Sequence, residues 1–215
     1  MLRADTSDPG AGPRHFAWHP NGHWCYLINE IGATIHALDY ATASGALRRI
    51  CSVSTLPAEA PPGAIGSTAH VLCSPCGRFV YGSNRPSPEG EGWGDNTVAV
   101  YSVDQEVSNS QTIVRSRWMA CCSRRPSGVH AVALWRRQSG ELSLVQHAPS
   151  LGLSPRNFAL SPCGRWMLLA NEHSGTVRVM AIDAETGKLT PTDQVVEGLP
   201  AALCLVFVER EAAAL

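Results

Sequence analysis

Five ionisable side chains stand near strand-ending positions of the sequence, and their types suit hydrolysis of an anionic ester or lactone. They are His15, Glu30, His70, Arg85 and Arg156. A carboxylate or a neutral imidazole can activate water as a general base. Arginine holds a phosphate or carboxylate through two hydrogen bonds and can stabilise the oxyanion of a tetrahedral intermediate. The sequence has no Gly-x-Ser-x-Gly motif and no nucleophilic cysteine context, so direct attack by water is favoured over an acyl-enzyme.

An internal repeat organises the chain and places these residues. It covers 13–30, 68–85 and 155–172. Each copy predicts a short strand, a Pro-x-Gly turn, an aromatic residue two positions after the glycine, and a second strand. The second strand always closes on an asparagine seven residues after that glycine. Self-similarity of this kind is typical of a repeat architecture.

The sequence after each closing asparagine predicts further strands, which gives four antiparallel strands per repeat. Four-stranded units in series are the blades of a β-propeller. The predicted blades cover about 13–55, 67–148 and 155–196, and 200–208 resembles the first strand of one more blade. The predicted fold class is therefore all-β, a propeller with about three to four blades in this chain.

The middle repeat is longer than the others because of a segment near 106–130 between its third and fourth strands. We interpret this segment either as an insertion loop or as sequence that a corrected gene model would remove. A basic nucleic-acid patch is the sharper alternative, because the segment carries Arg115, Arg117, Arg124 and Arg125. Arginines on one loop are usually just solvated, and we predict no nucleic-acid partner.

Antiparallel pairing puts the start of the first strand of a blade beside the end of the second. The ends that meet carry ionisable or amide groups in every repeat, namely Arg14 and His15 with Glu30, His70 with Arg85, and Arg156 and Asn157 with Glu172. If the first strand is innermost, as in propellers generally, these groups surround one mouth of the central channel. We expect the site there.

Each polar position also has a structural interpretation. Asparagine at a strand end often caps a turn, and this applies to Asn29, Asn84 and Asn171. Arg14 suits a salt bridge as well as a ligand contact. We expect structural or exposed roles for His19, His23, His36, His130 and His147.

No metal or other cofactor is predicted. His15, His19 and His23 have the spacing of helical metal ligands, but they fall on a strand and its turn, where that spacing does not converge. Cys73 and Cys76 form a Cys-x-x-Cys pair. The repeat aligns one of them with a turn and the other with a strand, which favours ordinary thiols.

Composition bounds the remaining classes. The net charge of −1 gives no general attraction to nucleic acid or to acidic membranes. No membrane span and no secretory signal are visible, so a cytoplasmic protein with no membrane partner is expected. Three blades do not close a ring, and open edges favour association. We therefore expect self-association through the open edges, a truncated gene product, or the C-terminal portion of a longer propeller.

The repeats resemble a known family. GPRHFAWHPNG with YLINE, AHVLCSPCGRFVYGSNR, and SPRNFALSPCGRWMLLANE with SGTVRVMAIDAETGKLTP are similar to the seven-bladed lactonase family. That family includes the propeller-type 6-phosphogluconolactonases and the fungal carboxymuconate lactonizing enzymes. The resemblance covers about 13–104 and 131–208. Cysteine replaces the usual aspartate of the turns at Cys76 and Cys163.

The resemblance implies metal-independent hydrolysis of 6-phosphogluconolactone or a similar sugar lactone, a reaction of carbohydrate metabolism in the pentose phosphate pathway. It implies the same site residues as the strand-end argument: His15, Glu30, His70, Arg85 and Arg156. Three alternatives stay open at this point. They are a lactone-forming cycloisomerase acting on a muconate, a non-catalytic propeller scaffold, and an inactive truncated form.

Overall fold

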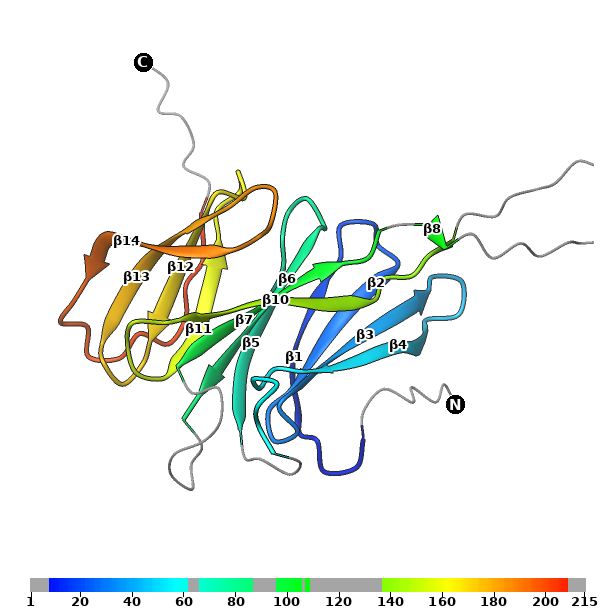
Figure 1. The fold of residues 1–215 in the computed structure, drawn as a ribbon, viewed down its shortest axis with the longest axis horizontal. Helices are drawn as coiled ribbons and strands as arrows, with labels where there is room; N and C mark the ends of the chain where they lie inside the picture. The colour runs from blue at the N-terminus through cyan, green and yellow to red at the C-terminus, as the bar shows by residue number, and fades with distance from the viewer. Residues whose placement is uncertain (1–7, 62–65, 87–95, 106, 109–136, 209–215) are drawn as a thin grey trace, which may run out of the picture. The chain divides into compact units, whose positions relative to one another are not determined.

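The computed structural model describes residues 8–61, 66–86, 96–105, 107–108 and 137–208. These residues form β-strands, turns and irregular segments (Figure 1). Among them, no helix is long and apolar enough to cross a membrane. Twelve of the strands form three antiparallel sheets of four strands each, which confirms the predicted all-β propeller class.

Each blade runs through its four strands in sequence order. The first blade consists of β1 (Pro13–Trp18), β2 (Trp24–Asn29), β3 (Thr34–Ala41) and β4 (Ala46–Ser54). The second consists of β5 (Ser67–Cys73), β6 (Phe79–Arg85), β7 (Thr97–Val103) and β10 (Leu142–Pro149). The third consists of β11 (Pro155–Leu160), β12 (Trp166–Asn171), β13 (Thr176–Ile182) and β14 (Leu189–Val196).

The chain leaves the second blade after β7 and returns to it at β10, which pairs antiparallel with β7. Of the described residues between these two strands, β8 (Val107–Ser108) pairs with β9 (Arg137–Gln138). The insertion predicted near 106–130 lies, apart from 107–108, outside the described residues.

The segment 200–208 differs from its prediction, because it carries no strand. A strand is defined by ladder hydrogen bonds to a neighbouring strand, and the described residues supply none here. Instead, the backbone N–H of Leu205 donates to Oδ1 of Asn157 at 2.9 Å, and that of Leu199 donates to the carbonyl of Gly175 at 3.0 Å. Ala202 is buried beside Ala170 and Val177.

Apolar side chains between neighbouring sheets form the core. Trp24, Tyr26 and Ile28 of the first blade pack against Val80 and Tyr101 of the second. Alternate residues of β6 point the other way, so that Phe79 and Tyr81 pack against Met167 and Leu169 of the third blade. The middle sheet is therefore covered on both faces. Its first strand, β5, lies between β1 and β11 (Figure 1).

Candidate active site

The strand register brings the predicted positions to one edge of each blade. Pro13 pairs with Asn29 in the first blade and Pro155 pairs with Asn171 in the third. In the second blade, Ser67 pairs with Arg85. The starts of β1, β5 and β11 therefore lie beside the ends of β2, β6 and β12. This arrangement is the one that antiparallel pairing predicts from the sequence.

A break in the register follows the first residues of all three inner strands. In β1 the ladder goes from Pro13 to His15, and in β11 from Pro155 to Asn157, which leaves Arg14 and Arg156 as the extra residues. An extra residue in one strand of a pair re-aims its side chain, and such bulges are common beside active sites. Arg14 and Arg156 therefore lie at β-bulges, where the backbone directs the side chain differently from a regular strand.

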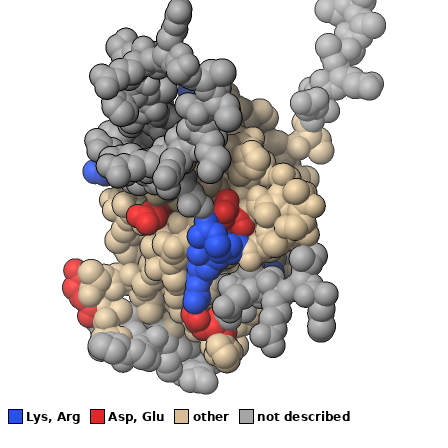
Figure 2. Space-filling view, turned by 90° about the vertical axis from the view of Figure 1, so that its right-hand side faces the viewer, with Lys and Arg blue, Asp and Glu red and all other residues tan. Residues whose placement is uncertain are grey.

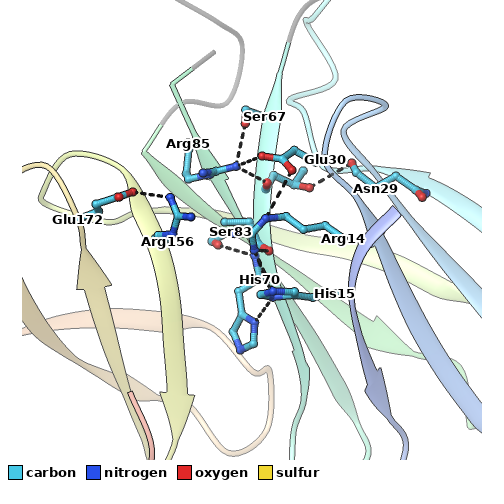
Figure 3. Close-up of polar contacts among 12 residues, drawn as sticks. Arg14, His15, Asn29, Glu30, Ser67, His70, Ser83, Arg85, Arg156 and Glu172 are labelled. Carbon is cyan, nitrogen blue, oxygen red and sulfur yellow. Dashed lines mark hydrogen bonds and ion pairs between the residues drawn. The ribbon is translucent and has the colours of Figure 1, made fainter. Parts of the chain in front are cut away.

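Glu30 of the first blade contacts two arginines, Arg14 of its own blade and Arg85 of the second (Figure 3). Nη2 of Arg85 donates a hydrogen bond to Oε1 of Glu30, and Nε of Arg14 lies 3.5 Å from Oε2 of the same carboxylate. Arg85 also donates to Oγ of Ser67 at 3.2 Å and to the carbonyl of Thr68 at 3.0 Å. Arg85 is 12% exposed and Glu30 is 39% exposed, so the ion pair is sheltered on its arginine side only.

The charge alternates at one repeat position. Glu30, Arg85 and Glu172 each follow directly after the asparagine that closes the second strand. Opposite charges at equivalent positions of adjacent blades attract, and the first two of these residues pair directly. The third pairs within its own blade, since Glu172 accepts a hydrogen bond of 2.9 Å from Arg156.

His15 and His70 meet at the interface of the first and second blades (Figure 3). Their Nδ1 atoms are 2.8 Å apart, and the ring of Phe158 packs on that of His70 with centroids 4.9 Å apart. Burial lowers the pKa of His70 to about 4, and the nearby His15 and Arg14 act in the same direction. Burial, followed by the charge of Arg14, also lowers the pKa of His15. Both rings are therefore neutral near pH 7.

The charge of Arg156 affects the pKa values of other ionisable residues at this edge of the blades, which we call the rim. Burial lowers the pKa of Arg14, and the charges of Arg85 and Arg156 lower it further. Burial would raise the pKa of Glu172, but the hydrogen bond and charge of Arg156 outweigh it and the pKa is lowered. Glu172 is therefore ionised near pH 7 and anchors Arg156.

All five predicted site residues lie on this rim, and the structure shows how they differ. His15, Glu30, His70 and Arg85 are connected across the first two blades, whereas Arg156 belongs to the third blade and pairs there with Glu172. The predicted set lacked Arg14 and Glu172, although both stood in the aligned strand-end groups. The missing signal was the bulge, which gives Arg14 its inward-reaching contacts.

The other polar residues of the repeat have structural roles. Asn29, Asn84 and Asn171 are fully buried, and their Nδ2 groups donate to threonine hydroxyls at 3.0–3.3 Å. His19 contacts the carbonyl of Gly77 at 3.0 Å, and His147 that of Thr55 at 2.8 Å. Within the described part of the chain, no three His, Cys, Asp or Glu side chains gather as a metal site would require.

The rim carries an excess of positive charge. Three guanidinium groups, from Arg14, Arg85 and Arg156, stand among two carboxylates, from Glu30 and Glu172. With the histidines neutral, the cluster retains one positive charge in a partly desolvated setting. It is therefore suited to an anionic or strongly polarised ligand.

Ion pairs elsewhere are more exposed. Figure 2 views the side of the molecule that carries β3 and β4, where basic atoms touch acidic ones and further acidic atoms stand apart from them. The exposed pairs of the first blade are Arg48 with Asp39 and Arg49 with Asp8, both at 2.9 Å. Pairs of this kind contribute little, typically about 0–1 kcal/mol.

The chain is a β-propeller that carries arginine, glutamate and histidine side chains together at one edge of its blades. Comparison with known proteins identifies its family. The family model described as "Lactonase, 7-bladed beta-propeller" matches residues 3–120 and 113–207. The chain belongs to this lactonase family.

Relatives with assigned names support the same placement. A 6-phosphogluconolactonase of Bacillus subtilis (strain 168) is 30% identical over 202 residues, which cover 94% of this chain and 46% of the relative. A 6-phosphogluconolactonase of Formosa agariphila is 30% identical over 192 residues, covering 88% of this chain and 42% of that protein.

Solved structures give the same result. A putative 6-phosphogluconolactonase of Bacteroides fragilis aligns with a TM-score of 0.68 at 27% identity, over 94% of this chain and 44% of that one. The periplasmic gluconolactonase PpgL of Pseudomonas aeruginosa aligns with a TM-score of 0.67 at 26% identity, over 91% and 42%. The chain thus spans less than half the length of these relatives.

Proposed function

We propose that this chain contributes the channel rim of a sugar-lactone hydrolase that acts on 6-phosphogluconolactone or a similar lactone without a metal ion. The names of the relatives and the chemistry of the rim both support this substrate class. The observation that carries the proposal is the convergence of three arginines, two glutamates and a neutral histidine pair at the strand ends of three successive blades.

The proposed reaction divides the work among these groups. Arg14, Arg85 and Arg156 bind the anionic part of the substrate and stabilise the oxyanion that forms on the carbonyl oxygen. Water attacks the carbonyl carbon and loses a proton to a general base, for which Glu30 and His15 are the candidates. Lowering of its pKa keeps His15 neutral and able to accept a proton near pH 7.

The test is hydrolysis of 6-phosphogluconolactone and of gluconolactone by the wild type and two rim variants. Glu30→Gln keeps the shape but removes the charge that holds Arg14 and Arg85, and we expect kcat/KM to fall about 100-fold. Arg156→Ala removes one anion contact, and we expect a loss of about 10–100-fold that is greater for the phosphorylated lactone. The matched control is Glu185→Gln on an exposed turn, which should hydrolyse like the wild type.

The hydrolysis rates show whether the chain is a lactone hydrolase and whether the rim carries the reaction. Equal rates for the wild type, the two rim variants and buffer alone would contradict lactone hydrolysis by this chain. A wild-type rate above buffer that neither rim variant changes would place the reaction elsewhere in the protein.

We also propose that the chain self-associates through its open sheet faces. The support is the exposure of large apolar side chains at both ends of the array, such as Phe16 and Trp18 in the first blade and Trp166 and Val196 in the third. Solution mass measurement tests this. Particles heavier than one chain of 23.0 kDa support it, and a monomer at every concentration would contradict it.

A further inference from the structure

Two cysteines occupy equivalent places in the turns between the first and second strands of the second and third blades. They are Cys76 and Cys163, and both are exposed. Asn21 stands at the same place in the first blade. The rim is formed by the starts of β1, β5 and β11 and the ends of β2, β6 and β12, so these turns lie at the opposite ends of the strands. Chemistry at the two cysteines is therefore separate from the proposed function.

The turn of the first blade shows which group this position favours. Oδ1 of Asn21 accepts the backbone N–H of His23 at 2.9 Å and that of Trp24 at 3.2 Å. An oxygen at this place thus satisfies backbone donors at the end of the turn. The position favours a hydrogen-bond acceptor. A thiol accepts only weakly, whereas a thiolate is charged and accepts strongly.

A buried serine hydroxyl contacts each sulfur. Oγ of Ser161 lies 3.3 Å from Sγ of Cys163, and Oγ of Ser74 lies at the same distance from Sγ of Cys76. Both serines are buried. Oγ of Ser161 also accepts the backbone N–H of Trp166 at 3.1 Å. With that contact made, its own hydrogen is available to donate to the sulfur.

Arginine supplies further donors to the sulfur of Cys163. The backbone N–H and the guanidinium group of Arg165 both donate to it. The contact with Ser161, followed by those with Arg165, lowers the pKa of Cys163 to about 7. A sulfur surrounded by donors accepts from all of them only when it has lost its own proton. The geometry of the turn therefore favours the thiolate.

Cys76 has a weaker form of the same turn. Burial would raise the pKa of this thiol, but its contacts with Ser74 and Arg78 outweigh burial and lower it. Arg78 also donates to the carbonyl of Ala184 in the third blade, so it divides its hydrogen bonds between two acceptors. We therefore rank Cys163 above Cys76 in reactivity.

Three buried cysteines show the opposite behaviour. Burial raises the pKa of Cys25 to about 11 and that of Cys73 to about 12, and it also raises the pKa of Cys51. The thiolate is the nucleophile in cysteine chemistry, so these thiols are inert near pH 7. The sequence favoured ordinary thiols for both Cys73 and Cys76, and the structure separates the two.

We propose that the turns of Cys163 and Cys76 are modification sites, at which a thiolate held by serine and arginine exchanges with a small disulfide such as oxidised glutathione. Sγ attacks one sulfur of the disulfide, and a new sulfur–sulfur bond forms as the old one breaks. The other half of the disulfide leaves as a thiolate, so no further oxidant is needed. Once Sγ is neutral, the guanidinium group of Arg165 can pair with a carboxylate of the attached group, which favours an anionic disulfide.

Alkylation of the wild-type chain by iodoacetamide, read at each cysteine by mass spectrometry, tests the thiolate. A thiol of ordinary pKa should react about 100-fold more slowly at pH 6 than at pH 8, since its thiolate fraction falls by that factor. Cys163 should lose only about 10-fold over the same range. The buried Cys25 should stay unlabelled, which confirms that the chain is folded. A 100-fold loss at Cys163 would overturn the proposal without any variant.

Substitution of Arg165 tests its part. Arg165→Met removes the guanidinium group but keeps the backbone N–H, and the loss in rate at Cys163 between pH 8 and pH 6 should steepen. The control is Arg48→Met on the exposed surface of the first blade, which should leave that loss at about 10-fold. An unchanged Cys163 in Arg165→Met would contradict the role of the guanidinium group.

Incubation of the wild-type chain with oxidised glutathione tests the exchange itself. We expect a mixed disulfide on Cys163 first and on Cys76 more slowly, with the buried Cys25 and Cys73 unmodified. Cystamine, a cationic disulfide, should modify Cys163 several-fold more slowly because Arg165 repels it. No mixed disulfide at Cys163 would overturn the proposal, and a faster reaction with cystamine would overturn the preference for anions. Lactone hydrolysis is not measured, so failure of the proposed function and failure of this proposal are distinguishable.

Discussion

The same repeat positions occur at the two interfaces between blades and on the outer face of the third blade. They are buried at the interfaces and exposed on the outer face. At the closed interfaces, Trp24 lies against Gly140 and Phe79 lies against Gly187. Each glycine stands just before the last strand of the next blade and is followed two residues later by a buried leucine, Leu142 or Leu189. An aromatic ring on one blade thus covers a glycine of its neighbour.

On the outer face of the third blade, the equivalent aromatic residue is Trp166, and it is 41% exposed. It lines a cavity of about 420 Å³ together with Leu168, Phe207 and neighbouring residues. At the other end of the array, Gly45 stands at the equivalent glycine position of the first blade and is exposed. The repeat therefore encodes a contact between blades, and burial by a neighbouring blade supplies the energy of that contact.

The largest expected effect is the difference in stability between variants that lack Trp24 and variants that lack Trp166. Trp24→Ala empties a buried interface and should lower the free energy of unfolding by about 3–5 kcal/mol. Trp166→Ala removes a half-exposed ring and should cost roughly 1 kcal/mol. Urea unfolding of both variants measures this difference. Equal losses would mean that Trp166 is as well covered in solution as Trp24, as self-association would produce.

A second prediction compares two glycines with the same backbone angle. Gly187 has a φ of 72°, and a Cβ there would meet Cδ1 of Phe79 at 2.4 Å. Gly22 has a φ of 71°, and a Cβ there meets nothing within 4 Å. Gly22→Ala should therefore cost only the backbone strain, about 1–2 kcal/mol.

Gly187→Ala should cost about 1–3 kcal/mol more, because the interface must also make room for the methyl group. Thermal unfolding of the pair gives the comparison. Identical melting temperatures would show that the aromatic residue does not press on the glycine turn.

A third prediction concerns pH and the polar rim of the first closed interface. The pKa of His70 falls from 6.5 to about 4 on folding, so its contribution to stability is full above pH 6.5 and is lost as the pH falls towards 4. The loss should be about 3 kcal/mol, and the lowered pKa of His15 acts in the same sense.

Urea unfolding of the wild type and of His70→Phe at both ends of that pH range tests this. The variant should lose less stability in acid than the wild type does. A wild-type curve as shallow as that of the variant would show that His70 titrates normally in the folded protein.

Most of the fold was predictable because its signals are local. Turn glycines, closing asparagines and strand lengths recur at fixed offsets, and antiparallel pairing follows from them. The segment 200–208 was predicted as a strand from its likeness to 155–160, but pairing needs a neighbour as well as a suitable sequence. Local pattern does not supply that neighbour.

The candidate site was predictable only in part. The sequence placed His15, Glu30, His70, Arg85 and Arg156 at the strand ends. It did not show that Glu30 would face Arg85 of the next blade, since that contact joins residues far apart in the chain. Nor did it show the bulge that turns Arg14 towards His15 and Glu30, because the bulge appears only once the two strands are paired.

The sequence by itself determined the blades, their order and the strand ends on which ionisable residues stand, because these depend on turns and alternation within a few residues. The tertiary structure decided which of those residues meet, which are desolvated and which stay exposed. His70 is the clearest example: its neutrality arises from burial between blades, from His15 and from Arg14. Burial and charge depend on distances in space, and adjacent positions in a repeat do not fix them.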